Sequence, residues 1–503
     1  MSNRSKGIIL SYLTVIVKNL SLLLYTQILL RFLGKSEYGL YQIANSVISN
    51  LTLLNLGFSF SYIKFYTGFA VKNEEKRIQK LNGTYLLFFT IISLLAGVIG
   101  GILVHNSPYF LSSSSIEEQT KLKNLMLFMI LNVVLTFLSA TFESNILANE
   151  RFVFQQIRQM FQSACLPLIT VPVLYFFHTD IVTIVIIQTM ITLVSLLCNV
   201  FFCIQKLRMR ITFRQLEFSF MKEIGIFSFF IFLNQLFNQI NDSAPVFTLG
   251  VLANTRQVAI YSIVNQLKAL FLTFSQVLTT IFIPKVNRLV HQSNDDRELT
   301  HLMIKIGQYQ LLVLGLFLGG FILLGKMFLF LWLGKGFDEA YYLLISIVIP
   351  LLIPLSQNIA IEIQQARNQY FFRSIMLTIF ACLNIVITIV CVKQAGINGA
   401  TIGYIFSLIV GYGFVMNWYY HKKMNLNMLL FWKKMLPAII PSILAVFISK
   451  LLLTIFPISN IPIFLFMGIV YCSIYGCSVF LLMPHVFQQF LGLLTKKEKR
   501  HQQ

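Results

Sequence analysis

The residues that could do chemistry in this chain are polar side chains set at helical spacing inside long apolar segments. The first such segment carries Thr14, Lys18, Ser21 and Tyr25. Steps of four, three and four residues place them on one face of a helix. A cation at the centre of a bilayer costs roughly 2.5–3.5 kcal/mol to insert, so we expect Lys18 to face water or an anion. We interpret this face as the wall of a substrate cavity, with snorkelling or an acid partner for Lys18 as the alternative.

A second polar stripe follows 220 residues later. It consists of Asn234, Asn238 and Asn241, which stand in the same register as the first three residues of the first stripe. We expect the two stripes to face each other across a central cavity. The alternative is hydrogen bonding between helices that only assembles a bundle.

Other ionisable residues in apolar segments have less specific interpretations. Lys268 lies one helical step from Asn265 and is the second candidate cation for the cavity. Arg31 stands near the outer end of its segment, where it is as well explained by anchoring the helix at the membrane surface as by binding a substrate. Asp242 is the most central acid, and it could bind a coupling proton or sodium ion or pair with a cation. Glu143 ends its segment near the cytoplasmic side, where we expect solvation to explain its charge.

The composition indicates a membrane protein. Of the 503 residues, 57% are hydrophobic and only 11% are charged, whereas about 25% charged residues is usual in soluble proteins. Segments of the length that spans a bilayer lie at 8–31, 40–63, 82–104, 123–147, 159–178, 181–204, 225–250, 259–283, 306–333, 341–361, 372–392, 397–420, 435–456 and 461–483. They predict an all-α polytopic protein of about fourteen transmembrane helices. No loop is long enough for a soluble catalytic or nucleotide-binding domain.

Basic residues predict the orientation of these helices. With the N-terminus inside, 28 of the 39 Lys and Arg fall in cytoplasmic segments and seven in outer loops or helix ends. Both termini are therefore predicted to be cytoplasmic. The net charge of +21 would meet anionic lipids. Because the basic residues occur in short clusters between apolar segments, we do not expect nucleic-acid binding.

Cysteine, histidine and carboxylate patterns favour no catalytic or metal chemistry. The seven Cys are scattered through apolar segments without a CxxC pair or a neighbouring His at zinc spacing. No Ser-His-Asp set or paired-carboxylate arrangement stands out either. We expect no disulfide framework, no metal, no cofactor and no catalytic residue.

The two halves of the chain resemble each other. Three short matches occur in order at offsets of 218 to 224, and they are 41–45 with 261–265, 83–85 with 307–309, and 148–154 with 366–372. The first match pairs Asn45 with Asn265, so Asn45 joins the cavity candidates. Parallel six-helix halves are a recurrent plan of transporters. We predict an N-terminal lobe at 1–204, a C-terminal lobe at 205–420, and two further helices with a basic tail at 421–503.

Residues 30–69 resemble the opening of the Wzx-type oligosaccharide flippases, which are bacterial polysaccharide-biosynthesis membrane proteins. The matching features are Arg31, Gly34, the run Glu37-Tyr38-Gly39-Leu40-Tyr41, and Leu56-Gly57. The turn at 148–152 and the stretch at 393–403 look similar too. These flippases belong to the superfamily of multidrug, oligosaccharidyl-lipid and polysaccharide exporters.

The resemblance implies a transporter, not an enzyme, in the bacterial cytoplasmic membrane. Its substrate would be an oligosaccharide on an undecaprenyl pyrophosphate carrier, flipped by alternating access and possible ion antiport for surface polysaccharide assembly. Lys18 and Lys268 would meet the pyrophosphate, and a polysaccharide polymerase and glycosyltransferases would be partners. The alternatives are a lipid II flippase, a multidrug exporter of the same superfamily, and a membrane glycosyltransferase or polymerase.

Overall fold

The computed structural model describes residues 3–55, 58–107, 115–177, 179–213, 235–236, 239–292, 295–367, 369–455, 460–484 and 486. These residues form helices and turns without a strand, which confirms the all-α prediction. The α-helices are α1 (Asn3–Ile48), α2 (Phe58–Val71), α3 (Glu75–His105), α4 (Ile116–Ala148), α5 (Phe152–Phe177), α6 (Ile181–Phe201), α8 (Thr255–Gln292), α9 (Asp296–Leu333), α10 (Asp338–Ser356), α11 (Asn358–Ala366), α12 (Tyr370–Ala395), α13 (Gly399–Phe406), α14 (Asn417–Lys422), α15 (Met428–Ile455) and α16 (Ile461–Leu482). Shorter 3-10 or π segments are η1 (Ser49–Asn55), η3 (Phe202–Lys206), η4 (Gly396–Asn398) and η5 (Ser407–Met416).

The chain is a multi-pass membrane protein. Among the described residues, ten segments are long and apolar enough to cross a membrane. They cover eleven of the predicted spans, because the segment Phe371–Lys422 contains two of them. The predicted spans at 8–31, 40–63 and 225–250 are not among the ten, and 225–234 lie outside the described residues. The count of fourteen therefore stays a prediction.

The first two predicted spans have other boundaries in the structure. Helix α1 continues through the predicted loop at 32–39, and its helical geometry breaks at Gly34, where φ is 78°. Glycine adopts this left-handed backbone without a steric penalty, so the chain can bend there between two helical stretches. The predicted span 40–63 is not one continuous α-helix, because α1 ends at Ile48 and the 3-10 segment η1 follows it before α2 begins at Phe58.

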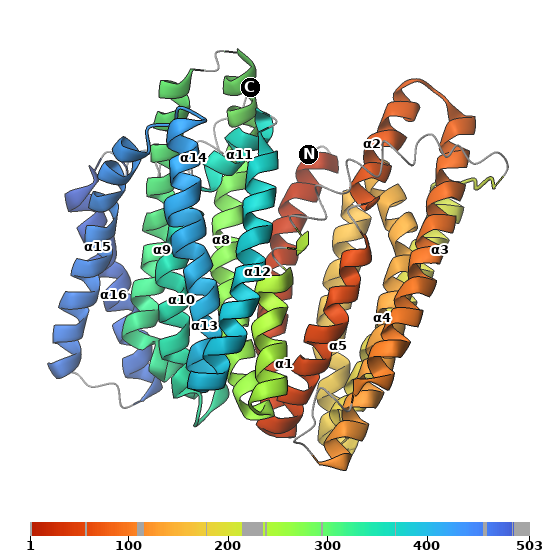
Figure 1. Ribbon diagram of the computed structural model, residues 1–503, viewed down its shortest axis with the longest axis horizontal. Coiled ribbons are helices and arrows are strands. Elements are labelled where there is room, and N and C mark those ends of the chain that lie inside the picture. Colours follow the sequence, from red (N-terminus) through yellow and green to blue (C-terminus); the bar gives the residue numbers. More distant parts are fainter. Residues whose placement is uncertain are drawn as a thin grey trace. The chain divides into compact units, whose positions relative to one another are not determined.

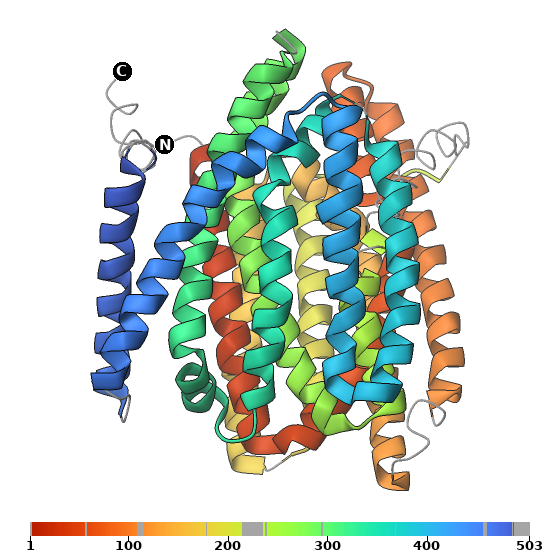
Figure 2. The ribbon, with the colours of Figure 1, turned by 60° about the vertical axis from the view of Figure 1, so that its left-hand side comes forward.

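The chain forms two compact units. Unit 1 comprises Met1–Ser262 and Val392–Ile397, and unit 2 comprises Ile263–Cys391 and Asn398–Gln503. Within unit 1, α4 packs against both α3 and α6, and α1 packs against α5 (Figure 1). Within unit 2, α9 packs against α10 and α15, and α15 packs against α16, which is the dark blue helix in Figure 2.

Glu37, from the run that carries the family resemblance, joins three helices of unit 1. Its Oε1 accepts a hydrogen bond from Lys121 Nζ on α4 at 2.9 Å. Its Oε2 accepts a longer one, 3.4 Å, from the backbone N–H of Ile181, the first residue of α6. The carboxylate also suits the positive end of the α6 dipole. This motif residue therefore holds helix ends together.

A hydrogen-bond network fixes another part of unit 1. Tyr62 Oη donates to Asn82 Oδ1 at 2.5 Å and accepts from Asn145 Nδ2 at 2.7 Å. Asn82 Nδ2 in turn donates to the carbonyl oxygen of Arg210 at 2.8 Å. Tyr62, Asn82 and Asn145 belong to α2, α3 and α4, and Arg210 lies in the segment after α6. The network therefore holds that segment against these three helices.

We predict that Gly83→Ala lowers the Tm of the detergent-purified protein by several degrees. An added Cβ at Gly83 would collide with the carbonyl oxygen of Thr212 in the segment after α6, and overpacking typically costs about 1–3 kcal/mol. The control is Gly101→Ala on the same helix, where no atom lies within 4 Å of the added Cβ. Alanine favours a helix over glycine by about 1 kcal/mol, so the control should keep or raise the Tm. Equal Tm values for the two variants would contradict this close approach.

Candidate functional site

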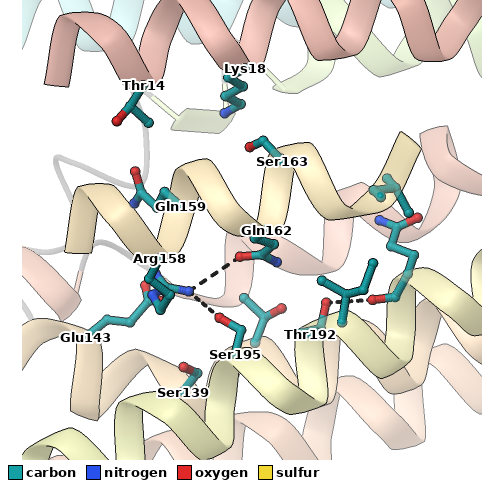
Figure 3. A pocket seen from close by; sticks show the side chains of 14 residues that line it. Thr14, Lys18, Ser139, Glu143, Arg158, Gln159, Gln162, Ser163, Thr192 and Ser195 are labelled. Carbon is teal, nitrogen blue, oxygen red and sulfur yellow. Dashed lines mark hydrogen bonds and ion pairs between the residues drawn. The ribbon is translucent and has the colours of Figure 1, made fainter. Parts of the chain in front are cut away.

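A polar cavity of about 400 Å³ lies inside unit 1, between faces of α1, α4, α5 and α6 (Figure 3). Its lining residues are Thr14, Lys18, Thr136, Ser139, Glu143, Arg158, Gln159, Gln162, Ser163, Leu166, Gln188, Ile191, Thr192 and Ser195. Three of them are ionisable, namely Lys18, Glu143 and Arg158. Most of the others carry hydroxyl or amide groups. We call this space the cationic cavity, because two of its three charges are positive.

Helical periodicity brings these side chains to one place. Thr14 and Lys18 are four residues apart and project from α1 toward α5 (Figure 3). Their predicted common face is thus present, and both residues line the cavity. On α5, Arg158 and Gln162 repeat the same step. Each helix therefore presents one polar stripe to the cavity.

An ion pair crosses the cavity wall between α4 and α5. Arg158 Nη2 lies 2.5 Å from Glu143 Oε1, and the side chains are 10% and 35% exposed, respectively. Arg158 Nη1 donates to Ser195 Oγ on α6 and, at 3.4 Å, to Gln162 Oε1. Asn199 Nδ2 on α6 donates to the same carboxylate oxygen at 3.3 Å. The pair thus links three helices.

The sequence interpretation of Glu143 was wrong, and Arg158 was missed. We expected solvation at the cytoplasmic side to explain the charge of Glu143, whereas its carboxylate pairs with the less exposed Arg158. Arg158 was counted with the cytoplasmic loop cations because it stands near the start of its apolar segment. A signal was present, since Gln159, Gln162 and Ser163 continue a polar stripe from Arg158 at helical spacing.

The electrostatics of the cavity favour an anion. The Glu143 carboxylate balances one of the two cations, Arg158. Lys18 is exposed to the cavity and makes no ion pair within the part of the chain that the structure describes. The cavity therefore has one positive charge in excess, surrounded by hydroxyl and amide groups that can hydrogen-bond an anionic group.

The other predicted residues of unit 1 lie outside this cavity. On α1, Ser21 is half-buried, Tyr25 is buried, and Arg31 is exposed three residues before the bend at Gly34. Asn45 is exposed to a second cavity of the same unit.

Part of the second polar stripe can be located in unit 1. Asn241 is buried and Asp242 is exposed. Asn234 and Asn238 lie outside the described residues. It stays a prediction that the two polar stripes face each other across a central cavity. The binding of a coupling proton or sodium ion by Asp242 also stays a prediction.

Lys268 belongs to unit 2, where it is 1% exposed. Its Nζ lies 4.5 Å from the ring centroid of Tyr404 on α13. Such a cation–π contact stabilises a desolvated cation by about 2 kcal/mol. Its neighbour Asn265 is half-buried. The role of both residues in substrate binding stays a prediction.

Comparisons with known proteins agree with this architecture. A family model described as polysaccharide biosynthesis protein matches residues 28–342. The lipid II flippase MurJ, in an inward closed conformation, has a TM-score of 0.73 at 15% identity, covering 94% of this chain and 98% of that chain. An inward-facing multidrug resistance transporter of the MATE family and MOP superfamily has a TM-score of 0.68 at 12% identity, covering 83% and 98%. Curated protein sequences give no significant match. The chain therefore has the fold of these transporters.

We predict strong coupling between Glu143 and Arg158 in a double-mutant cycle. Glu143→Gln or Arg158→Gln alone leaves one member of the pair charged without its partner, whereas the double variant leaves neither member charged. The coupling energy from reversible unfolding should be about 1–2 kcal/mol. The control is the pair of Arg77 and Glu74, 3.0 Å apart, whose arginine is 48% exposed against 10% for Arg158. Its coupling should stay below about 0.5 kcal/mol. Additive effects at Glu143 and Arg158 would contradict the pairing.

Proposed function

The chain belongs to the polysaccharide biosynthesis protein family, and we propose that it flips an undecaprenyl-pyrophosphate-linked oligosaccharide across the bacterial cytoplasmic membrane. As a transporter with the fold shared by flippases and exporters of the MOP superfamily, it would work by alternating access. The observation that carries the proposal is the cationic cavity with Lys18 and Arg158. Both termini would be cytoplasmic, following the distribution of basic residues.

The cationic cavity suits a pyrophosphate. Arginine presents a planar fork of donors that matches phosphate oxygens, and lysine adds a compact positive charge. A pyrophosphate crossing hydrocarbon without such partners would lose its hydration at a prohibitive cost. Lys18 would replace part of that hydration, together with the hydroxyl groups of Ser139 and Ser163 in the same lining. Arg158, whose Nη atoms bond Glu143, Ser195 and Gln162, would add positive charge at the cavity wall.

An apolar groove in unit 2 supports a substrate that carries a lipid. The groove has a volume of about 370 Å³ and is lined from α8, α9, α10 and α16 by mainly apolar side chains, including Phe271, Phe274, Phe317, Leu324 and Phe464. A surface of this kind cannot satisfy charged or hydroxyl groups, so hydrocarbon is the occupant that it suits. Taken by itself, the groove therefore has the chemistry that a lipid chain requires.

Two other transport functions are weighed against this one. A lipid II flippase would also move a pyrophosphate-linked sugar, so the same cavity would serve it. The similarity of the fold to MurJ supports this second candidate. A multidrug exporter that takes cationic drugs would need an acidic cavity, whereas this one has two cations and one acid. Asp242 is the candidate for coupling to a proton or sodium ion. Glycosyltransferases would supply the substrate, and a polymerase would take it up outside.

Deleting the gene in its bacterial host should abolish one surface polysaccharide. Lipid-linked repeat units should then accumulate on the cytoplasmic leaflet, because their synthesis continues while their export stops. Surface staining and lipid extraction would measure both effects. Normal surface polysaccharide would count against the proposal, and a block in peptidoglycan synthesis instead would favour lipid II as the substrate.

Lys18→Ala should reduce transport about tenfold or more without loss of membrane insertion. A hydrogen bond to a charged group contributes about 1.5–3 kcal/mol, which corresponds to that factor. The matched control is Lys123→Ala, an exposed lysine on α4 outside the cavity lining. Restoration of the polysaccharide in the deletion strain, at matched membrane levels, gives the measurement. Unchanged transport would remove Lys18 from the site.

A further inference from the structure

A second polar cavity, of about 280 Å³, lies beside the cationic cavity in unit 1. Thr136, Glu143 and Gln188 line both cavities, so the two share a wall. The second cavity is also lined by Tyr41, Asn45, Ser49, Thr52, Asn55 and Asn132. We call it the neutral cavity, because its lining contains no lysine or arginine and its one carboxylate, Glu143, is paired with Arg158.

Several amide groups of the neutral cavity lack partners. The side-chain amides of Asn45 and Gln188 make no hydrogen bond within the part of the chain that the structure describes. The Oδ1 atom of Asn55 is buried and has no partner among the described residues. An unsatisfied polar group away from water costs about 1–3 kcal/mol. This cost applies to the buried Oδ1 of Asn55. The half-buried Gln188 and the exposed Asn45 add amide groups that a polar occupant can hydrogen-bond.

The chemistry of the lining selects among polar occupants. An anion is disfavoured, because this lining contains the Glu143 carboxylate and no lysine or arginine that could bind an anion. A lipid chain is disfavoured by the amides and hydroxyls. Side-chain amides both donate and accept hydrogen bonds, as sugar hydroxyl groups do. The side chains of Tyr41 and Phe137 add apolar surface against which the C–H face of a sugar ring can pack.

We infer that the neutral cavity is a saccharide subsite, which binds one uncharged sugar residue through Asn45, Asn55 and Gln188. This inference rests on the proposed function, because the sugar would belong to the lipid-linked substrate whose pyrophosphate occupies the cationic cavity. The shared wall places the two subsites next to each other. A cavity of about 280 Å³ is at the small end of ligand sites, so it suits a single sugar residue and not a whole repeat unit.

The test compares binding of the carrier with and without a sugar. The full-length protein in lipid nanodiscs is titrated with undecaprenyl pyrophosphate, and with the same carrier bearing one glucose, galactose, rhamnose or N-acetylglucosamine residue. At least one sugar-bearing carrier should bind about two- to tenfold more tightly than the bare carrier per amide engaged. Asn45→Ala should remove the two- to tenfold share of one amide from this gain. It should leave the Kd of the bare carrier unchanged, which also shows that the variant is folded.

Two further variants sharpen the test. Asn55→Ala should act like Asn45→Ala, since its Oδ1 has no partner among the described residues to lose. The matched control is Asn50→Ala in η1, outside the lining, whose amide already donates to the Ser46 carbonyl oxygen at 2.7 Å. It should leave every Kd unchanged. Arg158→Gln should weaken the bare and sugar-bearing carriers by the same factor.

The outcomes separate this inference from the proposed function. If the wild-type protein binds the bare carrier but no sugar adds affinity, the neutral cavity holds only water and the saccharide subsite is overturned. If Asn45→Ala weakens bare and sugar-bearing carriers equally, Asn45 supports the fold and not the sugar, which also overturns it. Failure of the wild-type protein to bind any carrier would instead overturn the proposed function.

Discussion

The ion pair of Arg158 and Glu143 is the interaction on which the site in unit 1 depends. Two charges in an apolar bundle are tolerated only when each compensates the other and hydrogen bonds satisfy the remaining atoms. Here Ser195 and Gln162 bond Nη1 of Arg158, and Asn199 bonds the Glu143 carboxylate, whereas the buried Nε of Arg158 has no partner among the described residues. Because the pair draws on α4, α5 and α6 at once, it fixes the shape of the cavity and leaves the charge of Lys18 available inside it.

The same pair separates two kinds of chemistry. Lys18 and Arg158 give one cavity its positive charge, while Glu143 reaches the shared wall and is the charged residue of the other. An amphiphilic substrate with a charged and an uncharged polar part could therefore find a complementary surface for each.

The helices around these cavities restrict the amino-acid sequence less than the cavities do. Its helices need apolar faces and small residues at close approaches, such as Gly83 against the segment after α6. Many sequences can meet those demands, which explains how a fold is shared with the flippase MurJ at 15% identity. The function of the chain must then be argued from the few polar residues inside the bundle and not from the fold.

The sequence by itself determined the membrane class, the all-α fold and the common face of Thr14 and Lys18, because apolar content and helical periodicity are local properties. It did not determine the partner of Glu143. Arg158 is fifteen residues away on another helix, and only the packing of α4 against α5 and α6 brings the two side chains together. The sequence placed a break at 32–39, but it did not show that the helix continues up to Gly34 and resumes directly after it. Tertiary structure decided these features because they depend on which helices are neighbours.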